Sequence, residues 1–433
     1  MARNLSINAH FRAKAARHQP RLRYSGQPFA RWQDELLTAA RATLGHMPDK
    51  VPLNPEIQAE WREDGLIKQR VIFDVEQGLS AVAYVFRPEH ARGRLPAILA
   101  CHGHGPSGKE SVMGNRSTPQ LAADIVNHNY DYGLQMALAG FAVIAIDWRG
   151  FGERDDRRKP NFNDVDVQHP GMKRDLCNLH YLRATVLGQT VLGMDVHDGM
   201  RALDYLCQQD FIDSDRIGVM GLSFGGCMAT WMAICDLRIK ATDIICYSDR
   251  FADFGMRDVN FCGSQITPGL YELCDVPDLH GVIAPRPLLV EIGSYDECFK
   301  LDSAMSCFKE VEKIYAAAGA RDCLVLDLFE GGHKWGGNKS VAFFREHLGG
   351  SVGSESVDRR GDAGGRERMV IINRDMLRAS LSSGAGGGGG GGDSGAAKGA
   401  AGYAVGGGGA VGGAMPQPGG EEIDPTGGHG SAT

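Results

Sequence analysis

The sequence predicts an α/β domain, built on a mostly parallel, doubly wound sheet with helices on both faces. Two observations lead to this fold class: short apolar runs of the length of buried strands, and helical patterns that fall between them. A third observation sets the size of the domain, since 26 of the 59 glycines lie in residues 351–433. The part of the chain that can bury a core is therefore shorter than its 433 residues, and one large domain accounts for it.

The chain divides into three predicted parts. They are an N-terminal arm at 1–60, the α/β domain at 61–350 and a disordered glycine-rich tail at 351–433. The tail offers too little apolar surface to offset the entropy of ordering it. The arm begins with seven Lys or Arg and no acid in its first 33 residues. An ordered arm is favoured over an Arg-rich transit peptide, because serines are few and a helical pattern follows at 32–44.

Strands and helices are predicted from hydrophobic periodicity. Imperfect alternation at 67–75, followed by a run at 81–86, predicts two strands at the edge of the sheet. Continuous apolar runs predict buried strands at 96–101, 142–147, 216–221, 243–247, 288–293 and 323–329. Helical patterns lie at 121–139, 192–208, 224–235, 302–318 and 340–348. The alternation of the two favours a parallel sheet.

Two connections, 148–190 and 249–286, are too long for simple turns. Both carry aromatic side chains, so we expect them to fold over one end of the sheet. They are predicted to form the substrate pocket, with inserted loops above the active site.

Composition excludes several classes of protein. No run of 18 apolar residues is present, and the N-terminus lacks the apolar region of a secretory signal. Eleven cysteines without a C-x-x-C pair predict reduced thiols rather than a disulfide framework or a zinc site. The net charge of −7 is more negative still outside the basic arm, which argues against nucleic-acid binding. We expect a cytoplasmic protein that binds neither membrane nor nucleic acid, with organelle targeting by the arm as the alternative.

Ser223 is the predicted nucleophile. It stands in Gly221-Leu222-Ser223-Phe224-Gly225, which matches the G-x-S-x-G pattern of a strand-to-helix turn that presents a serine. An apolar strand run precedes the motif and a helical pattern follows it. The same letters occur at 349–353, around Ser351, without a strand before or a helix after. The context therefore favours Ser223.

His333 is the predicted base. A serine hydroxyl becomes a good nucleophile only when a neighbouring group removes its proton, and neutral histidine does this near pH 7. Four histidines follow Ser223 in the chain. His280 precedes a strand, His347 closes the last predicted helix and His429 lies in the tail. His333 follows the last strand in a glycine-containing loop, where its imidazole can reach the end of the sheet.

Asp296 is predicted to orient His333 and to stabilise the imidazolium. It follows the strand run 288–293 directly, in a turn, with Glu297 and Asp302 as neighbouring competitors. The chain order serine, aspartate, histidine is the order that this motif class shows.

The backbone N–H groups of His104 and Phe224 are predicted to form the oxyanion hole. Phe224 follows the nucleophile, and His104 lies in His102-Gly103-His104-Gly105, directly after the strand run 96–101. The alternative interpretation takes His102 and His104 as a metal pair. Because no further ligands cluster nearby in sequence, no metal is predicted.

Arg149 lies just after the strand run 142–147, at the start of the first long connection. Two roles are open for it: an ion pair that braces the connection, or a contact with an anionic group of the substrate. Bracing is favoured.

The combined motifs resemble the acetyl xylan esterase and dienelactone hydrolase-like branch of the α/β-hydrolases. The resemblance covers about residues 30–348 and rests on five ordered motifs, at 102–105, 147–152, 221–226, 293–296 and 331–333. It implies an α/β-hydrolase fold and an ester hydrolase that works through an acyl-enzyme, without metal or organic cofactor. Dienelactone hydrolases carry cysteine where this chain has Ser223. Sugar deacetylases of this branch carry glutamine where it has Phe151 and Phe224.

The sequence thus predicts a serine carboxylic-ester hydrolase for small or acetyl esters, with a small-molecule ester as its partner. One alternative is a prolyl-oligopeptidase-like serine peptidase, although about 65 residues before the first predicted strand are too few for a propeller. Another is a catalytically silent interaction protein, which would have no need for a serine at a strained elbow. The acyl group, the alcohol and the oligomeric state are left open.

Overall fold

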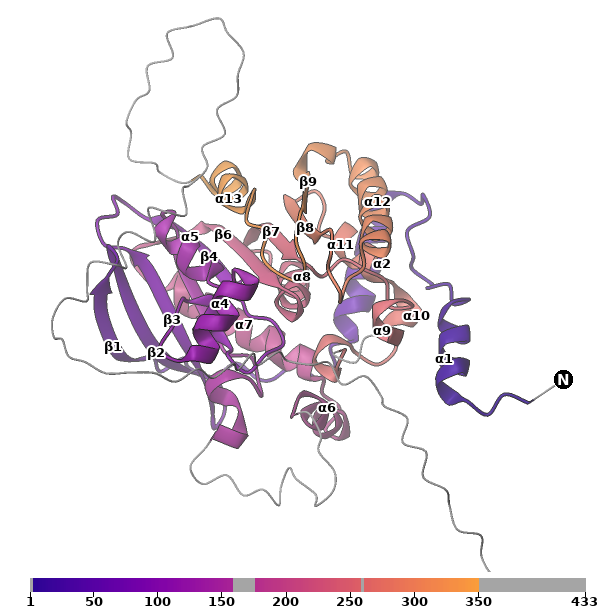
Figure 1. Ribbon diagram of the computed structural model, residues 1–433, viewed down its shortest axis with the longest axis horizontal. Coiled ribbons are helices and arrows are strands. Elements are labelled where there is room, and N and C mark those ends of the chain that lie inside the picture. The colour runs from indigo at the N-terminus through magenta and orange to yellow at the C-terminus, as the bar shows by residue number, and fades with distance from the viewer. Residues whose placement is uncertain (1–2, 159–175, 258–260, 350–433) are drawn as a thin grey trace, which may run out of the picture. The chain divides into compact units, whose positions relative to one another are not determined.

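Nine strands form a single sheet within residues 3–158, 176–257 and 261–349, which the computed structural model describes (Figure 1). The strands are β1 (Glu56–Glu63), β2 (Leu66–Glu76), β3 (Leu79–Pro88), β4 (Leu95–Cys101), β5 (Ala142–Ile146), β6 (Ile212–Leu222), β7 (Ile239–Ile245), β8 (Leu288–Gly293) and β9 (Leu324–Phe329). The tail predicted for 351–433 lies outside the described residues.

The sheet has the order β1-β2-β3-β5-β4-β6-β7-β8-β9. Strands β5, β4 and β6 to β9 are parallel to one another, whereas β1, β2 and β3 pair antiparallel at one side of the sheet. The carboxyl ends of the parallel strands therefore meet along one edge, where ligands of open α/β sheets bind. The predicted site residues lie in loops or turns that follow these strands. The exception is Phe224, which lies in the first turn of a helix.

The helices occupy both faces of the sheet. They are α1 (Ile7–Ala15), α2 (Phe29–Ala42), α3 (Lys109–Val112), α4 (Pro119–His128), α5 (Tyr132–Leu138), α6 (Leu176–Val186), α7 (Val191–Cys207), α8 (Phe224–Cys235), α9 (Phe254–Arg257), α10 (Leu270–Leu273), α11 (Val276–Gly281), α12 (Leu301–Ala317) and α13 (Ser340–Leu348). None of the helices described is both long enough and apolar enough to cross a membrane.

The sheet separates two hydrophobic cores, and β5 shows how its sequence serves both. Ile144 belongs to the core shared with α2, α7, α8 and α12, whereas Val143 belongs to the core shared with α5 and α13. Because both faces of the strand are buried, its sequence is a continuous apolar run rather than an alternating one. The strands predicted from such runs are confirmed as β4 to β9, but β9 forms the second edge of the sheet, and only Asp327 and Phe329 of it are buried.

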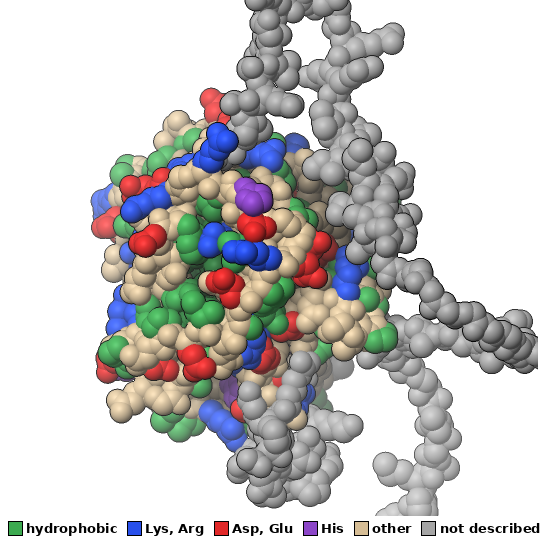
Figure 2. Space-filling view, turned by 90° about the vertical axis from the view of Figure 1, so that its left-hand side faces the viewer, with side chains coloured by type: hydrophobic (Ala, Val, Ile, Leu, Met, Phe, Trp, Pro, Cys, Tyr) green, Lys and Arg blue, Asp and Glu red, His purple; other side chains and the backbone are tan. Residues whose placement is uncertain are grey.

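The predicted position of the edge strands is wrong. The runs at 67–75 and 81–86 form β2 and β3, which are interior, because β1 pairs with β2 and forms the edge. No residue of β1 is buried, so hydrophobicity alone gives no indication of this strand. Figure 2 views this side of the molecule, where acidic and basic side chains are interspersed rather than gathered by sign. Charged side chains of this kind protect an edge strand from pairing with another chain.

The single helix predicted at 121–139 is two helices, α4 and α5. Asn129 caps α4 in the left-handed conformation, with φ of 50°, and this ends the helix. The break matters for the site because it places His128 and Tyr130 at the turn between the helices, beside the cavity described below.

The described parts of the two long connections pack against each other. Residues from α6 meet the turn Gly263–Gln265, where the Gly263 N–H donates a hydrogen bond of 2.9 Å to Asn178 Oδ1. A Cβ atom at Gly263 would overlap the ring of Tyr181 in α6. This close approach brings together segments that are far apart in the sequence.

Candidate active site

Ser223 lies at the sharp turn between β6 and α8, as predicted. Its φ of 61° and ψ of −122° fall in a region that non-glycine residues rarely adopt, at a cost of about 1–3 kcal/mol. Two backbone hydrogen bonds hold the turn: the Ser223 N–H donates to the carbonyl of Ile245 in β7 (2.9 Å), and the Ser223 carbonyl accepts from the Gly226 N–H (2.7 Å).

The glycines of the elbow are required by close backbone contacts. A Cβ atom at Gly225 would overlap the carbonyl oxygen of Cys101 at the end of β4, and one at Gly226 would lie 2.6 Å from Cβ of Tyr247. The motif is therefore a packing requirement of the strand-to-helix turn as well as a conformational one.

His333 and Asp296 form the second half of the site. His333 Nδ1 lies 2.9 Å from Asp296 Oδ2, and the Asp296 side chain is only 1% exposed. The other carboxylate oxygen, Oδ1, accepts from the backbone N–H groups of Cys298 (2.8 Å) and Phe299 (3.0 Å). Burial alone would raise the pKa of Asp296, but these hydrogen bonds, led by that of His333, hold it below its ordinary value. The carboxylate is thus ionised and oriented toward the imidazole.

The structure separates Asp296 from its competitors. Glu297 and Asp302 are exposed, the latter in the first turn of α12. The ring of Phe299 stacks on the imidazole of His333, with centroids 5.7 Å apart and planes 20° apart. His333 is therefore held on one side by a carboxylate and on one face by an aromatic ring.

The other candidate histidines lie away from the cavity. His280 is buried in α11, where burial lowers its pKa to about 3. His347 lies in α13 against the ring of Phe343. His429 is outside the described residues.

Ser223 and His333 line one cavity of about 210 Å³. Residues 103–108 of the loop that follows β4 form another wall, together with His128 and Tyr130. The Tyr130 hydroxyl accepts a 2.6 Å hydrogen bond from the Gly103 N–H, and the carbonyl of His333 accepts one of 2.9 Å from His128 Nδ1. Neither His128 nor Tyr130 is predicted from the sequence, because neither belongs to a recognisable motif.

His102 has a structural role. Its Nε2 accepts a hydrogen bond from the Trp148 N–H (3.0 Å), so Nδ1 carries the proton and donates to the Gly103 carbonyl (2.8 Å). Burial lowers its pKa to about 4, which keeps the ring neutral. Both ring nitrogens are thus engaged with backbone groups, and His102 does not pair with His104 as the alternative interpretation required.

Arg149 braces the first long connection, the favoured of its two roles. Its guanidinium donates to both oxygens of Asp198 in α7 (2.9 and 2.7 Å) and to Glu76 in β2 (3.0 Å). The Arg149 N–H also donates to Asp195 (2.9 Å). A bidentate pair of this kind fixes the start of the connection against the sheet.

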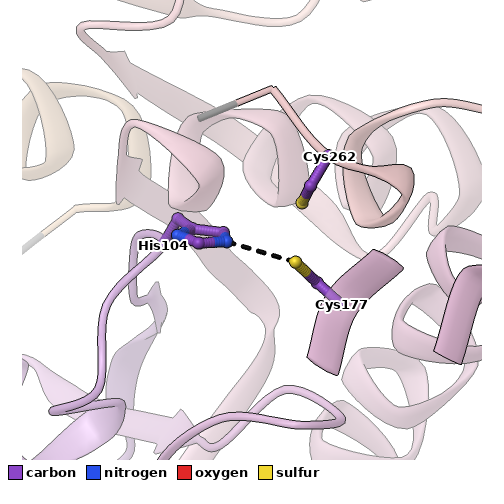
Figure 3. A group of neighbouring side chains, drawn as sticks. All are labelled: His104, Cys177 and Cys262. Carbon is purple, nitrogen blue, oxygen red and sulfur yellow. Dashed lines mark hydrogen bonds between the residues drawn. The ribbon is translucent and has the colours of Figure 1, made fainter. Parts of the chain in front are cut away.

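The imidazole of His104 points toward two cysteines (Figure 3). His104 Nε2 lies 3.3 Å from Sγ of Cys177 in α6, and Cys262, just before the turn Gly263–Gln265, completes the group. A hydrogen bond from Cys177 lowers the pKa of the Cys262 thiol to about 4, with His104 contributing and burial opposing. The sequence predicts scattered reduced thiols and gives no indication that these three side chains meet.

Residues 13–315 match the profile of the Abhydrolase family. The chain belongs to this family. It is 28% identical to the "putative hydrolase YtaP" of Bacillus subtilis (strain 168) over 299 residues. The aligned region covers 67% of this chain and 90% of that protein. The predicted α/β-hydrolase class of enzyme is thereby confirmed.

Solved structures show the same fold. A "putative acetyl xylan esterase" of Bacteroides fragilis aligns with a TM-score of 0.60 at 20% identity, over 76% of this chain and 83% of that one. A glucuronoyl esterase from Solibacter usitatus aligns with a TM-score of 0.55 at 16% identity, over 73% and 92% of the two chains. The predicted resemblance to acetyl xylan esterases is confirmed at the level of the fold.

Proposed function

We propose that this chain is a serine carboxylic-ester hydrolase that acts on small or acetyl esters through an acyl-enzyme. The observation that carries the proposal is the 2.9 Å contact between His333 and a buried Asp296, with His333 lining the same cavity as Ser223. The names of the fold relatives, an acetyl xylan esterase and a glucuronoyl esterase, support ester chemistry.

The proposed mechanism uses the two halves of the site in turn. Ser223 Oγ attacks the acyl carbon while His333 Nε2 takes its proton, since Nδ1 is held by Asp296. His333 then gives the proton to the leaving alcohol. Water repeats the sequence on the acyl-enzyme, with His333 again as base, and Ser223 is released with the carboxylic acid.

The oxyanion hole is proposed from the N–H groups of His104 and Phe224. Phe224 begins α8, where backbone N–H groups and the helix dipole favour negative charge. The Gly103 N–H is already committed to Tyr130, which supports His104 as the donor from the loop. Tyr130 then acts as a positioning residue that fixes the loop before the substrate binds.

The size of the cavity supports a small acyl group. Its volume of about 210 Å³ is below the ~300–1,000 Å³ of common ligand pockets. Phe151 and Phe224 are buried with their ring centroids 5.5 Å apart. The two side chains therefore offer no hydrogen bond to a sugar hydroxyl, so selection by acyl size is the simpler expectation.

A fluorophosphonate probe tests the proposal. We expect the folded full-length chain to be labelled at Ser223, as located by peptide mapping, and Ser223→Ala to lose both labelling and hydrolysis of p-nitrophenyl acetate. Ser351→Ala is the matched control, because Ser351 lies in the other G-x-S-x-G sequence. Labelling that spares Ser223, or an unchanged rate in Ser223→Ala, would refute the mechanism.

A panel of p-nitrophenyl esters of increasing acyl length, with acetylated sugars and a proline-linked chromogenic peptide, tests the substrate class. We expect the acetyl ester to have the highest kcat/KM. Turnover of the peptide without turnover of any ester would favour the peptidase alternative.

A further inference from the structure

The group formed by His104, Cys177 and Cys262 combines three donors that thiophilic metals prefer. One nitrogen and two sulfur atoms lie within 4.8 Å of one another. They come from the loop after β4, from α6 and from the segment before the turn Gly263–Gln265, so only the tertiary fold brings them together (Figure 3). The proposed ester hydrolysis does not use any of the three side chains.

We propose that His104, Cys177 and Cys262 bind one zinc ion, with a fourth position open to water or a small ligand. Two thiolates and one neutral imidazole form a ligand set in which soft sulfur favours zinc over magnesium or calcium. Two thiolates also balance the charge of Zn²⁺, and their protons are released to solvent on binding.

The distances fit such a site. In a tetrahedral zinc site with Zn–S of about 2.3 Å and Zn–N of about 2.0 Å, the donor atoms lie roughly 3.5–3.8 Å from one another. The distance of 3.3 Å between His104 Nε2 and Cys177 Sγ is already close to this range. The distances from Cys262 Sγ to the other two donor atoms are at most 4.8 Å, so they would have to shorten by at most about 1 Å. Side-chain rotation alone can supply a change of this size.

The surroundings also fit a bound ion. Cys177 and Cys262 are only 4% and 5% exposed, whereas His104 is exposed and provides a path of entry. The ring edge of Phe151 packs on the imidazole of His104, with centroids 5.2 Å apart, and Gln265 Nε2 lies 3.8 Å from Cys262 Sγ. Contacts of this kind orient the ligands of metal sites.

A zinc ion here would join three segments that are far apart in the sequence. It would tie α6 and the segment at Cys262 to the loop that carries the His104 N–H, at the wall of the Ser223 cavity. The zinc site stands on its own geometry and does not depend on the proposed esterase activity.

Metal uptake by the reduced full-length chain tests the proposal. After removal of metals with a chelator, Zn²⁺ is titrated in competition with a chromogenic chelator, and Co²⁺ is added in parallel as a spectroscopic probe. We expect one equivalent of Zn²⁺ per chain and, with Co²⁺, a thiolate-to-cobalt charge-transfer band that saturates at one equivalent. No uptake and no band would overturn the proposal without need of any variant.

Three variants and one control locate the site. Cys177→Ser, Cys262→Ser and His104→Gln should each weaken zinc binding by at least about 100-fold, since loss of outer contacts alone commonly costs 10–100-fold. Cys323→Ser, a partly buried cysteine in the 3₁₀ turn before β9, should bind like the unaltered chain. Equal uptake by all four variants would place the metal elsewhere and refute the assignment.

Mass spectrometry of the chain before and after reduction tests the alternative, which is a disulfide between Cys177 and Cys262. A Cys177–Cys262 disulfide in the isolated chain, together with no zinc uptake after reduction, would overturn the zinc site in favour of a redox pair.

Discussion

The elbow at Ser223 and the group of His104, Cys177 and Cys262 are built in different ways, although both use the loop 102–105. The elbow is contiguous in sequence and is held between β6 and α8, where Gly225 packs on the end of β4. The cysteine–histidine group draws on three segments, two of them in the long connections. A functional residue at the end of a buried strand can be recognised from a sequence motif. Functional residues that meet only when long connections pack together cannot.

The largest effect that the comparison predicts falls on the proposed catalytic residues. Asp296→Asn keeps the shape of the side chain but removes the charge that orients His333, so kcat should fall about 10⁴-fold, as in serine proteases. Assays of p-nitrophenyl acetate with added zinc and with added chelator measure this. A loss that zinc restores would contradict the separation of the two regions.

The packing of the elbow predicts the next effect. Gly225→Ala forces a Cβ against the carbonyl of Cys101 and should destabilise the fold by about 3 kcal/mol, measured by urea unfolding. Gly105→Ala is the matched control on the shared loop, because nothing lies within 4 Å of its added Cβ. We expect that control to change stability by less than about 0.5 kcal/mol. Equal effects at both glycines would show that the elbow is not held by packing.

Tyr130→Phe tests the loop that the two regions share. The change removes the acceptor of the Gly103 N–H and should lower kcat about 10-fold with little change in KM, because the loss falls on the positioning of the oxyanion loop. Steady-state kinetics on the acetyl ester separate the two constants. A change in KM alone would assign Tyr130 to substrate binding instead.

The smallest effect is the pH dependence of stability at Asp296. Its pKa is lowered in the folded chain, so its contribution to stability is present above the unfolded value of about 4 and is lost as pH falls through the folded value. The difference in unfolding free energy between the unaltered chain and Asp296→Asn should therefore shrink below about pH 4. Urea unfolding at neutral and acidic pH measures it, and a difference that grows on acidification would be inconsistent with a hydrogen-bonded, ionised Asp296.

The predictable part of the fold is the part buried on both faces. Continuous apolar runs located the largely buried strands β4 to β8. They also located β9 but did not indicate its position at the edge, whereas β1 has no buried residue and so left no pattern. The break at Asn129 was missed because the hydrophobic pattern continues across it, while the left-handed conformation that ends α4 depends on the turn.

The candidate site divides in the same way. Ser223, Asp296 and His333 follow strands and could be placed by chain order, and the structure brings Asp296 and His333 into contact. Tyr130 meets Gly103 only after α4 and α5 have folded onto the sheet, and Cys177 meets Cys262 only when two long connections pack together. Contacts of this kind depend on tertiary packing that periodicity does not encode.

Trapping of the acyl-enzyme is the most direct test of the central claim, that Ser223 is the nucleophile of an ester hydrolase. The full-length chain is mixed with p-nitrophenyl acetate, quenched in acid within the first turnovers and analysed by intact-protein mass spectrometry and peptide mapping. We predict one acetyl group per chain, located on Ser223, that disappears as the ester is consumed and never forms in Ser223→Ala. Turnover with no adduct at Ser223, or an acetyl group that accumulates on another residue at the rate of turnover, would contradict the account.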